Sequence, residues 1–140
     1  MYILDTDHVT LHQRNAKNLL TKIEVIPNEK VFVTVITLAE QMSGRLAFVR
    51  RAQSADKRRM GYRYLQEAHS YFCRRQILKF DQVAELHLHS LKAAKIRIGS
   101  NDLKIASIAL ANDMTVVTRN FRDFMRVPNL RIEDWSHPSA

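Results

Sequence analysis

Short apolar runs rich in β-branched residues recur along this chain of 140 residues, and longer stretches always separate them. No two runs are joined by a two-residue hairpin loop. Strands that alternate with helical stretches in this way are connected by right-handed crossovers and form a parallel sheet. The sequence therefore predicts an α/β fold with a central parallel sheet of about five strands, at 2–4, 31–36, 77–80, 114–117 and 130–132.

The stretches between these runs have the composition of helices. We expect helix-compatible sequence up to about residue 26, where Pro27 marks a turn, and a helical region over 37–73 in which Gly44 and Gly61 are possible breaks. Asp81 has the side chain of an N-cap for a helix that Gly99 would end near residue 98. The segment 102–111 is apolar almost all round, which predicts a buried helix.

The length of the chain is typical of one domain. We expect a single domain over 1–135 and a loose tail over 136–140. The lone cysteine, Cys73, excludes an internal disulfide framework and is expected to be a small buried apolar group. The sequence has neither an apolar run near the roughly 18 residues of a membrane span nor the order of a signal peptide. These features predict a cytoplasmic protein that does not contact a membrane.

The charge balance is strongly basic. The chain has 22 Lys+Arg against 14 Asp+Glu, a formal net charge of +8. This excess favours a polyanionic partner, either nucleic acid or an acidic protein segment. A basic surface that is merely solvated is the alternative.

Acidic and amide side chains follow several of the predicted strands. Because an open parallel sheet places its ligand site at the carboxyl ends of its strands, these side chains are expected at one edge. They come from four separate stretches: Asp5 and Asp7, Glu40, Asp102, and Asn120 with Asp123.

Each of these residues also has a purely structural interpretation. Asp7 and Asp102 have the side chains of helix N-caps, worth about 1 kcal/mol each. Glu40 could be a first-turn acid, and Asn120 a turn residue. We interpret Asp5 as a ligand and Asp7 as the cap of the following helix, close to the site.

Taken together, the acids suggest a cation. Carboxylates that converge raise one another's pKa unless a cation holds them. Oxygen ligands without cysteine suit Mg²⁺ or Mn²⁺ better than zinc. An acidic metal site in a basic protein is what phosphodiester hydrolysis requires, since arginine and lysine hold the phosphates while the ion polarises the scissile one.

Four stretches carry a resemblance to a known family, and together they reach both ends of the chain. They are YILDTDHVT, VTVITLAEQMSG, IRIGSNDLKIASIAL and VVTRNFRDFMRVPNLRIEDW. In these the chain resembles the PIN-domain ribonucleases, specifically the VapC-type toxins of toxin–antitoxin pairs. The resemblance implies a three-layer α/β/α sandwich and a Mg²⁺- or Mn²⁺-dependent endoribonuclease. It also implies a homodimer, and an antitoxin whose tail inserts near the site.

The same resemblance implies roles for individual residues. Asp5, Glu40 and Asp102 would bind the metal, and Asn120 would complete the catalytic set at a position where the family has aspartate or asparagine. Cleavage would leave a 3′-hydroxyl and a 5′-phosphate. We expect the side chains that support the ligands to be Asp7, Thr118 and Asp123, and those that contact RNA to be Arg119, Arg122 and Arg45.

Two other functions fit parts of the sequence. LDTDHVT also matches the opening strand of haloacid-dehalogenase-like phosphatases, which place a nucleophilic aspartate two residues before an acid. No acidic pair such as DD follows the fourth run, however. The second alternative is a non-catalytic RNA- or partner-binding module with the same fold, and Asn120 is the feature that favours it.

Two side signals remain open. His8 and His12 stand four residues apart and could form a zinc pair on one helix face, although no third ligand is near in sequence. The segment 45–63 is dense in arginine and lysine and contains Tyr62. It could line an RNA path, or it could belong to an amphipathic helix pair that forms a dimer or antitoxin groove.

Overall fold

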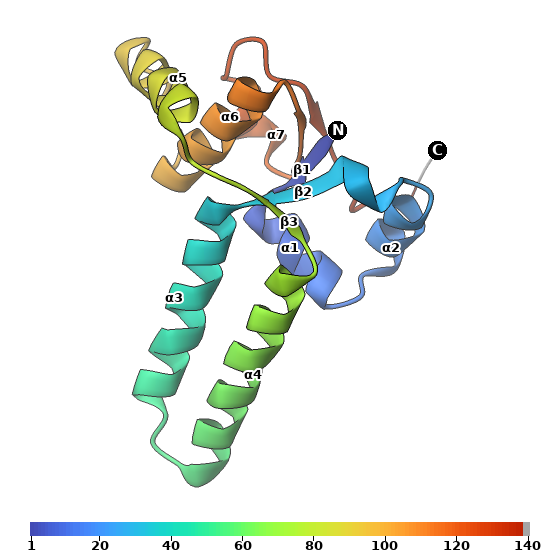
Figure 1. Cartoon of the computed structure of the whole chain (residues 1–140), viewed down its shortest axis with the longest axis vertical. Coiled ribbons are helices and arrows are strands. Elements are labelled where there is room, and N and C mark those ends of the chain that lie inside the picture. Colours follow the sequence, from blue (N-terminus) through green and yellow to red (C-terminus); the bar gives the residue numbers. More distant parts are fainter. Residues whose placement is uncertain (139–140) are drawn as a thin grey trace.

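Five parallel strands form one sheet at the centre of the molecule (Figure 1). The computed structural model describes residues 1–138. The strand order is β3-β2-β1-β4-β5, and every neighbouring pair is parallel. The predicted α/β fold with a five-stranded parallel sheet is thus confirmed. The strands are β1 Tyr2–Leu4, β2 Val31–Thr34, β3 Gln76–Leu78, β4 Thr115–Val117 and β5 Ile132–Glu133.

Helices cover both faces of the sheet. Their bounds are α1 Thr6–Gln13, α2 Lys17–Glu24, α3 Val35–Arg51, α4 Ala55–Cys73, α5 Gln82–Ala93, α6 Ser100–Asn112 and α7 Phe121–Phe124, with a 3-10 turn η1 at Asn28–Lys30. Successive strand residues point to opposite faces, so Ile3 packs among the apolar side chains of α5 and α6. Its neighbour Leu4 packs on the other side, with Val9 of α1 and Leu19 of α2. This alternation builds the expected α/β/α layers.

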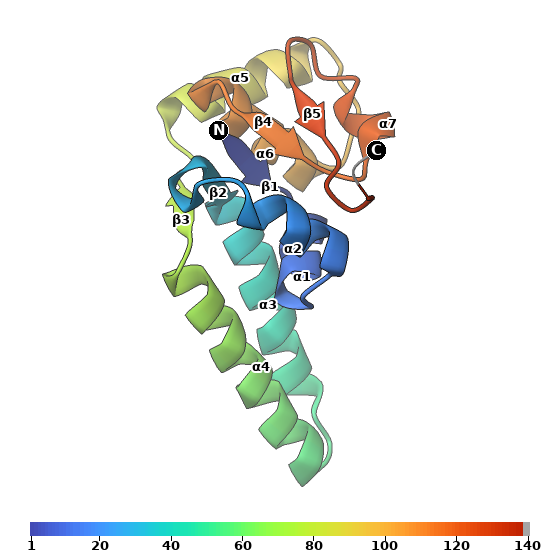
Figure 2. The same ribbon diagram turned by 90° about the vertical axis from the view of Figure 1, so that its right-hand side faces the viewer.

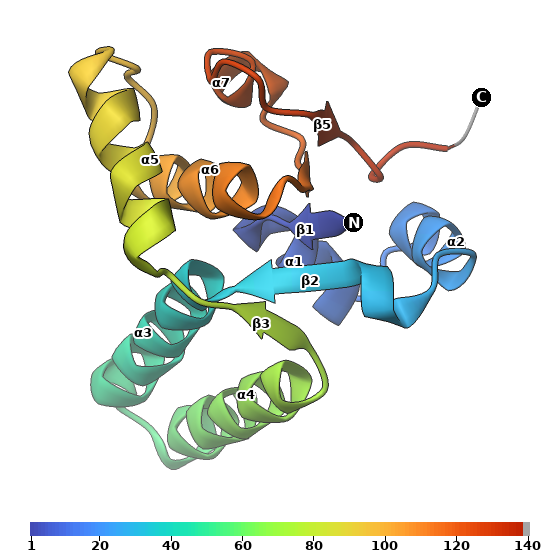
Figure 3. The ribbon, with the colours of Figure 1, turned by 45° about the horizontal axis from the view of Figure 1, so that its top comes forward.

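Helices α3 and α4 form an antiparallel hairpin that extends away from the sheet, while α5 and α6 lie at the opposite end of the molecule (Figure 2). The chain leaves the hairpin through β3, which runs beside β2 (Figure 3). The long helical region predicted over 37–73 is therefore two helices, and the predicted breaks at Gly44 and Gly61 are wrong. The turn falls at 52–54, where Ser54 caps α4 by accepting from the Lys57 backbone N–H at 3.1 Å.

Other boundaries also differ from the sequence prediction. Strand β2 is shorter than predicted because Thr34 caps α3 and accepts from the Thr37 N–H at 3.3 Å. Asp81 is the N-cap of α5 as predicted. That helix ends at Ala93 rather than near residue 98, and Lys95 adopts a left-handed backbone conformation with φ of 59°.

Cys73 is exposed, contrary to the prediction that it is buried. Of the tail predicted over 136–140, residues 139 and 140 lie outside the described residues. Trp135, which directly precedes this tail, is buried against the face of the sheet that carries α1 and α2. Over residues 1–138, no helix combines the length and the apolarity that a membrane crossing requires.

Candidate active site

The predicted acids meet in one pocket at the carboxyl ends of the central strands. Five of the residues singled out in the sequence line it: Asp5, Asp7, Glu40, Asp102 and Asn120. Asp5 directly follows β1, Glu40 lies on α3 after β2, Asp102 lies in the first turn of α6, and Asn120 follows β4. Four segments that are distant in sequence thus supply one site, as the parallel topology requires.

Asp5 both caps a helix and faces the pocket. It is buried, and its Oδ1 accepts from the backbone N–H of His8 at 2.8 Å, which makes it the N-cap of α1. The prediction that Asp7 is this cap is therefore wrong. Asp7 is the second residue of α1. Its carboxylate accepts from Arg119 Nε at 2.5 Å and from Arg119 Nη2 at 2.9 Å.

Glu40 is held by the first turn of α1. Its Oε1 accepts from the Thr6 hydroxyl at 3.0 Å, and that hydroxyl also lies 3.0 Å from the hydroxyl of Thr37. Helix α3 is fixed at its start by the Thr34 cap, so the chain positions Glu40 from both sides.

Asn120 bridges two acids. Its Nδ2 donates to Asp123 Oδ2 at 3.0 Å and, more weakly, to Asp102 Oδ2 at 3.4 Å. The buried Thr118 accepts from the Asn120 backbone N–H at 2.9 Å and fixes the turn after β4. Thr118 and Asp123 thus lie behind Asn120 in supporting positions.

The pocket is electrostatically unfavourable for the carboxylate of Asp102. Partial burial raises the pKa of Asp102, and the negative charges of Asp5, Glu40 and Asp123 raise it further. The hydrogen bond from Asn120 opposes this shift. A cation among these oxygens would relieve the repulsion.

The donor set fits a hard divalent cation, because carboxylate and amide oxygens are the ligands that Mg²⁺ and Mn²⁺ prefer. The side chains as they stand are not gathered around one point. Within residues 1–138, no three His, Cys, Asp or Glu side chains are grouped closely enough to hold an ion together. Hydrogen bonds from His8, Thr6 and Asn120 hold the acids in this arrangement.

The three arginines predicted to contact RNA do not lie together. Arg119 is exposed beside the acids, and its hydrogen bond with Asp7 raises its pKa. Arg122 is exposed on α7. Arg45 lies on α3 in a separate pocket, with side chains of α1 and α4.

Sequence reasoning missed the role of His8. Its ring is fully buried, and Nδ1 lies 3.2 Å from Asp5 Oδ1. The other ring nitrogen, Nε2, accepts from the backbone N–H of Trp135 at 3.3 Å and lies 3.5 Å from Asp134 Oδ1. The three-residue spacing from Asp5, within the first turn of a helix, was the available signal. His12 bonds Tyr71 instead, so the two histidines do not form a zinc pair.

Comparisons with known proteins find relatives over nearly the whole chain. No family model matches the chain. The tRNA(fMet)-specific endonuclease VapC of Salmonella typhimurium is 28% identical over 138 residues, which cover 96% of this chain and 97% of that protein. Ribonuclease VapC2 of Rickettsia felis is 28% identical over 141 residues, which cover 96% and 98%.

Solved structures give the same result. The DNA-bound VapBC of Salmonella typhimurium aligns with a TM-score of 0.77 at 26% identity, covering 96% of this chain and 97% of that one. VapBC2 of Rickettsia felis, bound to a DNA fragment from its promoter, aligns with a TM-score of 0.76 at 26% identity, covering 96% and 98%. The resemblance recognised in the motifs is confirmed: over nearly its whole length, this chain is similar in sequence and in fold to the VapC-type PIN-domain toxins.

Proposed function

We propose that this protein is a Mg²⁺- or Mn²⁺-dependent endoribonuclease and the toxin of a toxin–antitoxin pair. The observation that carries the proposal is the single pocket in which Asp5, Glu40, Asp102 and Asn120 meet, with the pKa of Asp102 raised. The relatives named as ribonucleases support the same activity.

In this proposal Asp5, Glu40 and Asp102 hold the metal, and Asn120 completes the set. The ion would supply charge stabilisation at the scissile phosphate and activation of water. The chain's own groups orient the site. His8 holds Asp5, Thr6 holds Glu40, and Asn120 holds Asp102.

Arg119 is suited to contact the substrate near the cut. Its guanidinium is exposed, and its hydrogen bonds with Asp7 hold it beside the acid pocket, close to where a phosphate would enter. The formal net charge of +8 favours association with RNA more generally.

We also propose two protein contacts, an antitoxin and a second copy of this chain. The structural neighbours include VapBC complexes, which supports an antitoxin partner. The family resemblance supports a homodimer.

Cleavage of RNA by the purified protein tests the activity. With Mg²⁺ or Mn²⁺ the wild type should cut RNA and leave 5′-phosphate ends. Asp5→Asn and Asp102→Asn should each lower the rate by about a hundredfold or more, because each removes a charge that holds the ion. Asp56→Asn, at the exposed tip of the hairpin, is the matched control and should cut like the wild type. Equal cutting by all variants, or in EDTA, would contradict the proposal.

A phosphatase remains testable in parallel. Turnover of para-nitrophenyl phosphate, abolished by Asp5→Asn and without RNA cleavage, would favour haloacid-dehalogenase-like chemistry. If neither activity is found and divalent ions do not stabilise the protein, it is a binding module.

A further inference from the structure

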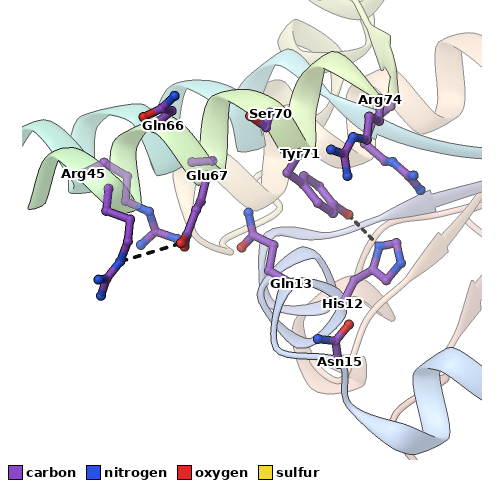
Figure 4. Close-up of a pocket in the computed structure, with 12 residues that line it drawn as sticks. His12, Gln13, Asn15, Arg45, Gln66, Glu67, Ser70, Tyr71 and Arg74 are labelled. Carbon is purple, nitrogen blue, oxygen red and sulfur yellow. Dashed lines mark hydrogen bonds and ion pairs between the residues drawn. The ribbon is translucent and has the colours of Figure 1, made fainter. Parts of the chain in front are cut away.

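A second, more basic pocket lies between the end of α1 and the α3–α4 hairpin (Figure 4). It has a volume of about 660 Å³. Arginines from three places line it: Arg45 of α3, Arg63 of α4, and Arg74 with Arg75 at the end of α4. Glu67 is the acid in this lining, and its Oε1 lies 3.8 Å from Arg63 Nε. The pocket therefore keeps an excess of positive charge.

Two of these arginines are poorly satisfied by the protein. The Nε atoms of Arg45 and Arg75 are buried and have no hydrogen-bond partner within residues 1–138. An unpaired buried N–H is unfavourable, and the protein thus leaves part of the hydrogen-bonding capacity of these two guanidinium groups unused. The guanidinium of Arg75 also lies over the Tyr71 ring, 5.4 Å from its centroid, which fixes its position.

The remaining polar groups of the pocket do not offset this charge. Tyr71 Oη lies 2.8 Å from His12 Nδ1, as the close-up shows (Figure 4). Burial raises the pKa of Tyr71 to about 12, so its hydroxyl is neutral at physiological pH. Burial, and then the charge of Arg75, lower the pKa of His12, which therefore is neutral too. Apart from Glu67, the side chains that line the pocket therefore supply no negative charge to its arginines.

Helix α1 connects this basic pocket to the acid pocket. Asp5 and Asp7 lie at its start and His12 and Gln13 at its end, about 12 Å apart for eight residues. Gln41 of α3 packs beside α1 and contacts two of its residues. Its amide donates to the Thr10 hydroxyl at 3.3 Å and to Gln13 Oε1 at 3.0 Å.

We propose that the basic pocket binds a backbone phosphate of the RNA substrate, a few nucleotides away from the bond that is cut. This inference rests on the proposed function, and it adds a second anchoring point that sets where the strand lies. An RNA strand that starts in the acid pocket can follow α1 to the arginines. Planar guanidinium groups match phosphate oxygens. An acidic protein segment has matching charge as well, and the test below includes binding of such a segment as an alternative outcome.

Binding of RNA without divalent ions tests this proposal separately from cleavage. A short fluorescein-labelled single-stranded RNA is titrated with protein in EDTA, and anisotropy is recorded over a series of salt concentrations. Arg45→Gln, Arg74→Gln and Arg75→Gln should each weaken binding by about tenfold. The variant with all three substitutions should make the slope of log K against log salt less negative by about 0.7, the value for one lost phosphate contact on a single strand.

Arg58→Gln is the matched control, since it removes the same charge from an exposed position near the far end of the hairpin. It should bind nearly like the wild type. Arg74 is exposed, so its variant keeps the fold even if the two partly buried arginines are needed for stability, and thermal melts check all of them.

Three results would overturn the proposal: no RNA binding by the wild type, an equal loss in Arg58→Gln, or normal RNA binding by the three variants. Variants that bind RNA normally but lose affinity for an acidic protein partner would assign the pocket to that partner. Loss of binding in the three variants, together with no cleavage by the wild type under any divalent ion, would support the pocket while contradicting the nuclease.

Discussion

The His8 ring lies between Asp5, near the start of the chain, and the backbone of Trp135, which follows β5. In the neutral ring Nε2 accepts from Trp135, so the proton is on Nδ1 and is donated to Asp5. Nε2 also lies 3.5 Å from Asp134 Oδ1. The ring thus orients the carboxylate that we propose as a ligand.

Two amide substitutions separate the two ends of this ring. His8→Gln retains an acceptor near the Nε2 position and loses the donor to Asp5. His8→Asn retains the donor and loses the contact with Trp135. We expect kcat for RNA cleavage to fall about tenfold or more in His8→Gln, the effect typical of residues that orient ligands. His8→Asn should mainly lower Tm. Equal losses of kcat in the two variants would contradict the positioning role.

Asp102 should reduce the stability of the protein that it serves. Its pKa is raised in the folded state, so its stabilising contribution is complete below the unfolded value of 3.8 and is lost as pH rises through the folded pKa. Near pH 7 and without divalent ions, Asp102→Asn should therefore melt at a higher temperature than the wild type. The difference should vanish below about pH 3.8. A lower Tm for this variant at pH 7 would show that the negative charge of Asp102 does not destabilise the folded protein.

The cap of α1 could not be assigned from sequence because Asp5 and Asp7 stand only two residues apart and either side chain can cap a helix. Strand β1 ends at Leu4 and helix α1 starts at Thr6, so a single residue separates them. The cap therefore falls on Asp5 rather than Asp7. The convergence of Asp5, Glu40, Asp102 and Asn120 could be predicted, because it follows from parallel topology alone. The place of Arg45 could not, since it depends on where the α3–α4 hairpin turns.

At the scale of elements, the hairpin shows why its glycines misled the prediction. Gly61 lies inside α4, and a Cβ there would come within 2.9 Å of Phe48 Cδ1 and 3.1 Å of Val49 Cγ2 on α3. This glycine allows two helices to approach closely and does not break either. That requirement involves a residue on the partner helix, so a local pattern cannot reveal it. The strands, in contrast, were predicted from their own β-branched residues.

The two helical glycines form a matched pair for testing this packing. Gly61→Ala should lower the free energy of unfolding by about 1–3 kcal/mol, because the added methyl forces the Phe48 ring to shift. Gly44→Ala has open space around it and should raise the free energy of unfolding by about 0.5–1 kcal/mol. Urea denaturation measures both. Stabilisation of similar size by both alanines would show that α3 and α4 do not pack this closely.

At the scale of the whole molecule, the acid pocket brings negative side chains from separate parts of the chain together. A divalent ion that binds the folded protein but not the unfolded chain should raise the free energy of unfolding. At a free concentration one hundred times its Kd, the expected gain is about 2.7 kcal/mol. Thermal melts with Mg²⁺ or Mn²⁺ should show a higher Tm for the wild type and for Asp56→Asn. They should show little change for Asp102→Asn, and a wild type that does not respond would contradict the metal site.

The strand order has a consequence for the chain as it is synthesised. β1 lies at the middle of the sheet, and its neighbour on one side is β4, more than a hundred residues later in the sequence. Asp102 and Asn120 reach Asp5 only when that neighbour is in place. A nascent polypeptide still attached to the ribosome therefore has no assembled acid pocket until β4 and the turn that carries Asn120 have emerged. The nuclease activity that we propose would arise only from that point, and the proposed antitoxin could be made before then.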